Sequence, residues 1–273
     1  MKIKFYIFLF CAVTASVNYS QNLLFKPITV EDGLSSSDAN CMLQDKSGFI
    51  WIGTDNGLNR FDGSEFKVYR NNQSNPNSIS DNSIWALFED RTGNIWVGTK
   101  GGVLNKYLPV LDKFERLHLS EDKNTETSIT SILEDSDGLF WIGTYSQGLF
   151  RYETKTGKIT NWEYDPTNKK GLSNNYISSL LQDEAGFIWI STYNGLNRIN
   201  PKNISDGFNN YFSSESNQNS ISNNLVWRIS QSTVNKNLLW IGTANGLCNY
   251  DIEKNKFTRL TIKPGYLLQF SNS

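Results

Sequence analysis

The sequence predicts an all-β fold, a β-propeller with five four-stranded blades. Three observations lead to this prediction: one aromatic motif recurs at nearly constant spacing, short β-prone segments and turn residues separate its copies, and no stretch has helical periodicity. The motif has the form Trp-Ile-Gly-Thr. Its tryptophans lie 45, 45, 48 and 51 residues apart, at Trp51, Trp96, Trp141, Trp189 and Trp240. Most of each repeat period must therefore belong to one repeated structural unit.

Each repeat divides into four strands. A polar cluster such as Ser80-Asp81-Asn82 precedes the first strand, which ends in an Asp-x-x-Gly turn. This turn suits a tight hairpin, because aspartate can bond its own turn and glycine tolerates positive φ. The tryptophan motif forms the second strand, Asn-Gly turns such as Asn56-Gly57 lead into the third, and segments such as Phe66–Tyr69 form the fourth. We expect blades over 34–78, 79–127, 128–171, 172–220 and 221–262.

The tryptophans of the motif are predicted to pack between neighbouring blades, where their large apolar area is most useful. The fifth repeat has 232–237 in place of the Asp-x-x-Gly turn, so we expect a longer hairpin there.

The first residues have the order of a secretory signal peptide, with Lys2 and Lys4 before an apolar run over 5–13 and small polar residues after it. We assign 1–20 to the signal peptide and 21–273 to the propeller repeats, which predicts a periplasmic protein. An uncleaved membrane anchor is the alternative. No later run is long and apolar enough to span a membrane.

The number of outer strands suggests a fragment of a larger propeller. The segment 25–29 resembles an outer strand, yet the fifth repeat already has its own over 257–262. Six outer-strand candidates for five blades predict an incomplete seven-bladed ring and a truncated N-terminal part of a longer protein. A closed ring of five blades with one redundant strand is the alternative.

The composition argues against several functional classes. A net charge of -1 gives no basic surface for nucleic acid. With His118 as its one histidine and no Gly-x-Ser-x-Gly or phosphate-binding loop, the chain offers no catalytic set, metal site or cofactor site. Cys41 and Cys248 occupy different repeat positions, which favours two thiols over a disulfide.

Candidate ligand-binding residues lie where the repeats differ. The hairpin after each motif threonine and the link into each first strand are expected on one face, opposite the Asp-x-x-Gly turns. Aromatic rings with amide neighbours on that face suit sugars. The candidates are Trp85, Tyr145, Tyr176, Tyr193, Asn194 and Trp227. Trp85 and Trp227 share one repeat position, where filling a blade interface is the competing explanation.

The Trp-Ile-Gly-Thr motif, with Asp-x-x-Gly before it and Asn-Gly-Leu-Asn-Arg after it, resembles the two-component regulator propeller repeat. Glu31-Asp32-Gly33-Leu34-Ser35 also resembles the opening phrase of that family. The resemblance covers about 25–262. It implies the periplasmic sensor region of a Bacteroidetes hybrid two-component regulator, which senses oligosaccharides and in its full-length form carries kinase and output domains, with a possible homodimer.

The chain is therefore predicted to be a non-enzymatic glycan-sensing propeller with an oligosaccharide ligand and no cofactor. The kinase and output domains of the family have no counterpart in this sequence. Two alternatives from other classes remain: a protein-interaction scaffold, and a propeller lyase or quinone-dependent dehydrogenase.

Overall fold

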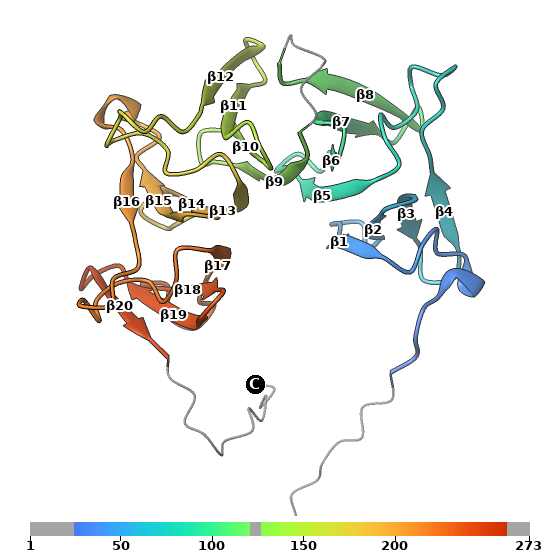
Figure 1. The fold of residues 1–273 in the computed structure, drawn as a ribbon. Coiled ribbons are helices and arrows are strands. Elements are labelled where there is room, and N and C mark those ends of the chain that lie inside the picture. The colour runs from blue at the N-terminus through green and yellow to red at the C-terminus, as the bar shows by residue number, and fades with distance from the viewer. Residues whose placement is uncertain (1–24, 121–126, 261–273) are drawn as a thin grey trace, which may run out of the picture.

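A computed structural model describes residues 25–120 and 127–260 and shows five four-stranded antiparallel sheets arranged as an arc (Figure 1). The first sheet consists of β1 (Ala39–Gln44), β2 (Ile50–Thr54), β3 (Gly57–Phe61) and β4 (Phe66–Tyr69). The second consists of β5 (Ile84–Glu89), β6 (Ile95–Thr99), β7 (Val103–Leu108) and β8 (Lys113–His118). The third consists of β9 (Ile129–Glu134), β10 (Phe140–Thr144), β11 (Leu149–Glu153) and β12 (Lys158–Trp162). The fourth consists of β13 (Ile177–Gln182), β14 (Ile188–Thr192), β15 (Gly195–Ile199) and β16 (Asn209–Tyr211). The fifth consists of β17 (Val226–Gln231), β18 (Leu238–Thr243), β19 (Gly246–Asp251) and β20 (Lys256–Arg259).

The predicted propeller is confirmed: each sheet is a blade with its four strands in sequence order. The first strand of every blade packs beside the first strand of the next, so that β1, β5, β9, β13 and β17 line the inside of the arc (Figure 1). The outermost strands, by contrast, lie on its rim. The predicted signal peptide over 1–20 and the last residues of the chain lie outside the described residues.

The predicted N-terminal outer strand is wrong. Residues 25–29 form no strand, and the side chain of Phe25 is 86% exposed. A short 3-10 helix, η1 (Val30–Asp32), follows, with Thr29 and Asp32 forming a capping box. The fifth blade uses its own β20 as outer strand, so 25–29 has no sheet edge to complete there.

The five blades do not close into a ring. Figure 1 shows the blade of β1 and the blade of β17 at the two ends of the arc, facing the same gap. Within 25–120 and 127–260, the alternative of a closed five-bladed ring is therefore wrong. One face of the first blade and one face of the fifth blade have no blade beside them.

The aspartate of each Asp-x-x-Gly turn holds both its hairpin and the tryptophan that follows. Asp135 Oδ1 accepts the backbone N–H groups of Asp137 at 2.9 Å and Leu139 at 3.0 Å. Its Oδ2 accepts the indole N–H of Trp141 at 2.7 Å. The same indole bond recurs between Asp45 and Trp51, Asp90 and Trp96, and Asp183 and Trp189. In the fifth blade, where this aspartate is missing, Trp240 is only partly buried.

Four of the five motif tryptophans, Trp51, Trp96, Trp141 and Trp189, pack between blades as predicted, whereas Trp240 of the fifth blade does not. Trp51 is 1% exposed, and its ring meets Tyr107 of the second blade edge-on at 5.1 Å between centroids. Trp189 meets Tyr250 of the fifth blade in the same way at 5.1 Å. These pairs belong to apolar clusters that each include residues of two successive blades, so most of the core lies at the joints rather than within single sheets.

The motif glycine provides the closest approach between blades. A Cβ placed on Gly143 would lie 2.5 Å from Cγ2 of Ile177, the first residue of β13. Gly53 and Gly98 stand in the same relation to Ile84 and Ile129. The glycine therefore leaves room for a β-branched side chain of the next blade, and we call this contact the motif socket. Gly242 of the fifth blade has no such neighbour.

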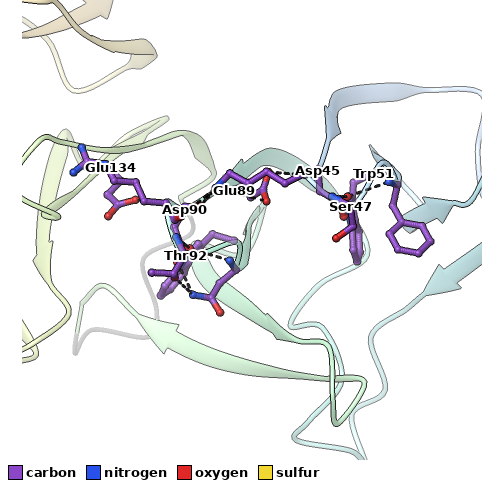
Figure 2. A network of polar contacts seen from close by, with 12 residues as sticks. Asp45, Ser47, Trp51, Glu89, Asp90, Thr92 and Glu134 are labelled. Atoms are coloured by element: carbon purple, nitrogen blue, oxygen red, sulfur yellow. Dashed lines mark hydrogen bonds and ion pairs between the residues drawn. The ribbon is translucent and has the colours of Figure 1, made fainter.

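A belt of hydrogen bonds joins the blades on the face of the Asp-x-x-Gly hairpins (Figure 2). In the second, third and fourth blades, the residue before the hairpin aspartate accepts a backbone N–H from the hairpin of the preceding blade. The pairs, donor first, are Lys46 to Glu89 at 3.0 Å, Arg91 to Glu134 at 2.8 Å and Ser136 to Gln182 at 2.8 Å. The sequence neighbours Glu89 and Asp90 therefore serve different hairpins.

We expect Asp90→Asn to lower the free energy of unfolding by about 1–3 kcal/mol at pH 7, because the amide presents a donor to the N–H of Trp96. Burial disfavours the charged form of Asp90, but hydrogen bonds from Trp96, Asn94 and Thr92 outweigh it and lower the pKa to about 2. A carboxylate with a lowered folded pKa stabilises the protein above its ordinary pKa near 3.8, and this stabilisation is lost as the pH falls toward about 2.

Urea unfolding of the parent and Asp90→Asn at several pH values would measure this effect. The difference should be constant from about pH 7 to 5 and should shrink below about pH 4. Asp137→Asn, at an exposed position of the next hairpin, is the matched control and should be close to neutral. A difference for Asp90→Asn that does not change with pH would contradict the assignment.

Candidate ligand-binding face

One extra residue interrupts the first strand of every blade. The pairing of the first and second strands shifts at this point, between Ile84 and Ala86 in the second blade, for example. The extra residues are Asn40, Trp85, Thr130, Ser178 and Trp227. Such β-bulges redirect a side chain, and all five lie on the strands that line the inside of the arc.

Three of the bulge residues bond the next blade. Each polar side chain donates a hydrogen bond to the carbonyl oxygen of the first residue in the following first strand. The pairs are Asn40 to Ile84 at 3.1 Å, Thr130 to Ile177 at 2.7 Å and Ser178 to Val226 at 2.6 Å. At these joints the bulge position has a structural role.

The two bulge tryptophans do not make this bond to a following blade. Trp85 is 37% exposed and donates its indole N–H to Ser83 Oγ at 3.0 Å. Trp227 is 48% exposed. Both residues are thus partly accessible, although Trp227 also contacts the ring of Tyr193 in the fourth blade.

Four of the six predicted residues form one aromatic cluster, which consists of Tyr145, Tyr176, Tyr193 and Trp227. Tyr145 and Tyr176 lie 4.8 Å apart between ring centroids, and Tyr176 and Tyr193 lie 5.6 Å apart. Tyr193 meets the ring of Trp227 edge-on at 5.5 Å. The cluster thus extends over the third, fourth and fifth blades. Tyr145 is 43% exposed and Tyr176 39%, so the cluster is a surface feature and not part of the core.

Burial within the cluster, and to a smaller extent the neighbouring Tyr145, raise the pKa of Tyr193. Its phenol therefore stays neutral at physiological pH and can both donate and accept a hydrogen bond. Asn194 follows it in the hairpin and is exposed. Its backbone N–H donates to Thr192 Oγ1 at 3.1 Å, which fixes the turn that carries both residues.

The structure places Trp85 apart from the aromatic cluster, on the second blade beside the first. No ring contact joins it to the cluster among the described residues. The indole is instead linked through Ser83 to Asp55 of the first blade. The six predicted residues therefore fall into two groups on neighbouring parts of the arc.

The motif threonine builds the hairpins of this face, a role that the sequence analysis missed. Thr54 Oγ1 accepts the backbone N–H of Asn56 at 3.0 Å and donates to the carbonyl oxygen of Gly57 at 2.9 Å. The hydroxyl of Ser35 lies 2.8 Å from Thr54 Oγ1. Equivalent serine–threonine pairs occur at Ser80 and Thr99, Ser173 and Thr192, and Ser222 and Thr243. The recurrence of these serine and threonine residues in the sequence could have revealed this role.

Other reactive groups are dispersed. Cys41 and Cys248 are both free thiols, and burial raises the pKa of Cys41 to about 12. His118 is exposed at the end of β8. Among residues 25–120 and 127–260, no group of three or more His, Cys, Asp or Glu side chains could hold a metal ion. In the same residues no helix is long and apolar enough to cross a bilayer.

Four segments match the family described as two component regulator propeller, at residues 33–56, 78–101, 125–146 and 171–194. A stretch of 74 residues, 27% of this chain, is 47% identical to Histidine kinase P4 of Formosa agariphila. That stretch corresponds to 5% of the kinase.

The fold is similar to two extracellular domains from B. thetaiotaomicron, described as parts of the hybrid two component systems BT4673 and BT3049. Against BT4673 the identity is 25% and the TM-score 0.66, with 83% of this chain and 28% of that chain covered. Against BT3049 the identity is 26% and the TM-score 0.70, with 85% of this chain and 31% of that chain covered. The chain thus spans less than two thirds of the length of each relative. The chain therefore contains repeats that match the two component regulator propeller family, and its blades are arranged as in these extracellular domains.

Proposed function

We propose that this chain is the ligand-sensing region of a hybrid two-component regulator, that it acts in the periplasm after export, and that it binds an oligosaccharide without chemical conversion. The single observation that carries the ligand class is the aromatic cluster of Tyr145, Tyr176, Tyr193 and Trp227. The likeness to extracellular domains of two component systems supports the sensor role.

The chemistry of the cluster suits a sugar chain. Partly exposed rings offer apolar faces on which the C–H faces of pyranose rings can pack, and their removal from water favours binding. The phenols of Tyr145, Tyr176 and Tyr193 and the amide of Asn194 provide donors and acceptors for sugar hydroxyls. Because the rings belong to three blades, a ligand longer than one sugar unit would contact all three.

Isothermal titration of the chain with a panel of neutral and acidic oligosaccharides would test the proposal. For a neutral hexasaccharide that binds, we expect Tyr193→Ala to weaken binding by about tenfold or more, because Tyr193 contacts the rings of Tyr145, Tyr176 and Trp227. Loss of this central ring removes stacking area and disorders its neighbours.

Tyr164→Ala is the matched control, since Tyr164 is 47% exposed and lies outside the aromatic cluster. It should leave the affinity unchanged. The far-UV circular dichroism of both variants should match that of the parent. Absence of binding to every oligosaccharide, together with capture of a stable protein partner, would favour the scaffold function over the sensor function.

A further inference from the structure

Each joint between blades presents three side chains on the ligand-binding face. These are the residue after the motif threonine, the residue before the next first strand, and the bulge residue of that strand. At the joint between the first and second blades they are Asp55, Ser83 and Trp85. The corresponding positions between the third and fourth blades hold Tyr145 and Tyr176 of the aromatic cluster, followed by Ser178. The first joint thus replaces two tyrosines by a carboxylate and a hydroxyl.

A chain of hydrogen bonds fixes the first joint. The indole N–H of Trp85 donates to Ser83 Oγ at 3.0 Å, and the Ser83 hydroxyl donates to Asp55 Oδ1 at 2.7 Å. The side-chain amide of Asn40 donates to the same Oδ1 at 2.9 Å. Asn40 also bonds the carbonyl oxygen of Ile84, so the carboxylate is held against both blades.

The arrangement leaves one carboxylate oxygen unused. Asp55 Oδ2 accepts no hydrogen bond from the described residues, and the side chain is exposed. The bonds from Ser83 and Asn40, with a smaller contribution from the charge of Lys100, lower the pKa of Asp55 and keep it ionised. Asp55 Oδ2 is therefore a fixed hydrogen-bond acceptor near Trp85, which is 37% exposed.

We propose that Asp55, Ser83 and Trp85 form a second subsite, which binds one uncharged sugar unit: a hydroxyl donates to Asp55 Oδ2 while the ring packs on Trp85. This inference rests on the proposed oligosaccharide function and extends it to a part of the arc outside the aromatic cluster. The side chain of Asn40 is a positioning group, because it orients the carboxylate through Oδ1.

The charges around the subsite select the ligand. Asp55 repels an acidic sugar, whose carboxylate would face an ionised carboxylate without a hydrogen between them. The charge of Lys100, the smallest contribution to the lowered pKa of Asp55, offsets part of the attraction of this carboxylate for a cationic amino sugar. A neutral hydroxyl is repelled by neither charge and forms a charge-assisted hydrogen bond with Oδ2.

The test is isothermal titration of the full chain with cellohexaose, xylohexaose, mannohexaose and the hexamer of galacturonic acid. For a neutral hexamer that binds the parent, we expect Asp55→Asn to weaken binding about tenfold, the size of one lost charge-assisted hydrogen bond. The preference for neutral over acidic hexamers should decrease in the same variant. Asp38→Asn changes an exposed acid in the link before β1 and is the matched control, with unchanged affinity expected.

The outcomes separate the two proposals. If no hexamer binds the parent, the proposed function itself fails. If a neutral hexamer binds, Tyr193→Ala weakens it and Asp55→Asn does not, the aromatic cluster is the binding site and the second subsite is overturned. If Asp55→Asn weakens only a glucosamine oligomer added to the panel, the carboxylate is a cation site and the assignment to a neutral hydroxyl is overturned.

Discussion

Replacing Trp141 by alanine is expected to lower the free energy of unfolding by about 3–5 kcal/mol, the range for a large aromatic side chain lost from a core. Trp141 is fully buried and stacks on Trp162 at 5.6 Å between centroids. Its indole N–H is bonded to Asp135, so the substitution also leaves a buried carboxylate oxygen without that partner. The cluster around it includes residues of the fourth blade, such as Ile177.

Urea unfolding followed by far-UV circular dichroism would measure the effect without depending on tryptophan fluorescence. Trp240→Ala removes the same side chain from the fifth blade, where no blade covers it and the ring is only partly buried. It should cost about half as much or less. Equal losses at the two positions would show that the joint between blades contributes little.

The second large loss of stability is expected when a methyl group is added at the motif glycine, in the motif socket. Gly143→Ala should destabilise the protein by about 1–3 kcal/mol, because the new Cβ would lie 2.5 Å from both Ile177 Cγ2 and Ser131 Oγ. Gly242→Ala is the control within the same motif: its Cβ would meet only the carbonyl oxygen of Arg228, at 3.9 Å. That change should be within about 0.5 kcal/mol of neutral.

A double variant would identify the contact responsible. Ile177→Ala removes the Cγ2 atom that the new Cβ would meet. Gly143→Ala combined with Ile177→Ala should therefore cost less than the sum of the two single changes, measured by thermal unfolding. Strictly additive effects of the two substitutions would contradict direct contact between these positions.

Much of the fold could be predicted because the residues that repeat along the sequence are also those that hold the hairpins and the joints between blades. The same residues that make the repeat visible, such as Trp141 and Asp135, also make the contacts that hold its hairpin and joint. The segment 25–29 was assigned wrongly because its apolar residues resemble a strand, whereas a strand also needs a free edge to pair with. Sequence alone does not show which edges are free.

The candidate site could be predicted only in part. The aromatic residues Tyr145, Tyr176 and Tyr193 were found because they vary while the surrounding motif repeats. The bulge was missed because an extra residue in a strand is defined only by the pairing with its neighbour. Asp55 stood in a hairpin that looked like an ordinary turn, so its bonds to Ser83 and Asn40 could not be anticipated.

The socket contact also makes the blade an exchangeable unit. At three joints a glycine in the second strand, Gly53, Gly98 or Gly143, faces an isoleucine that begins the next blade. Whole repeats of this kind could be duplicated or deleted in the gene without redesigning a core, since each joint involves only adjacent blades. The blade with Ser191 is the exception, because serine stands where the other four repeats have glycine, and the next blade begins with Val226. Recombination that separated this pair would place isoleucine against serine, a combination that none of the described joints contains.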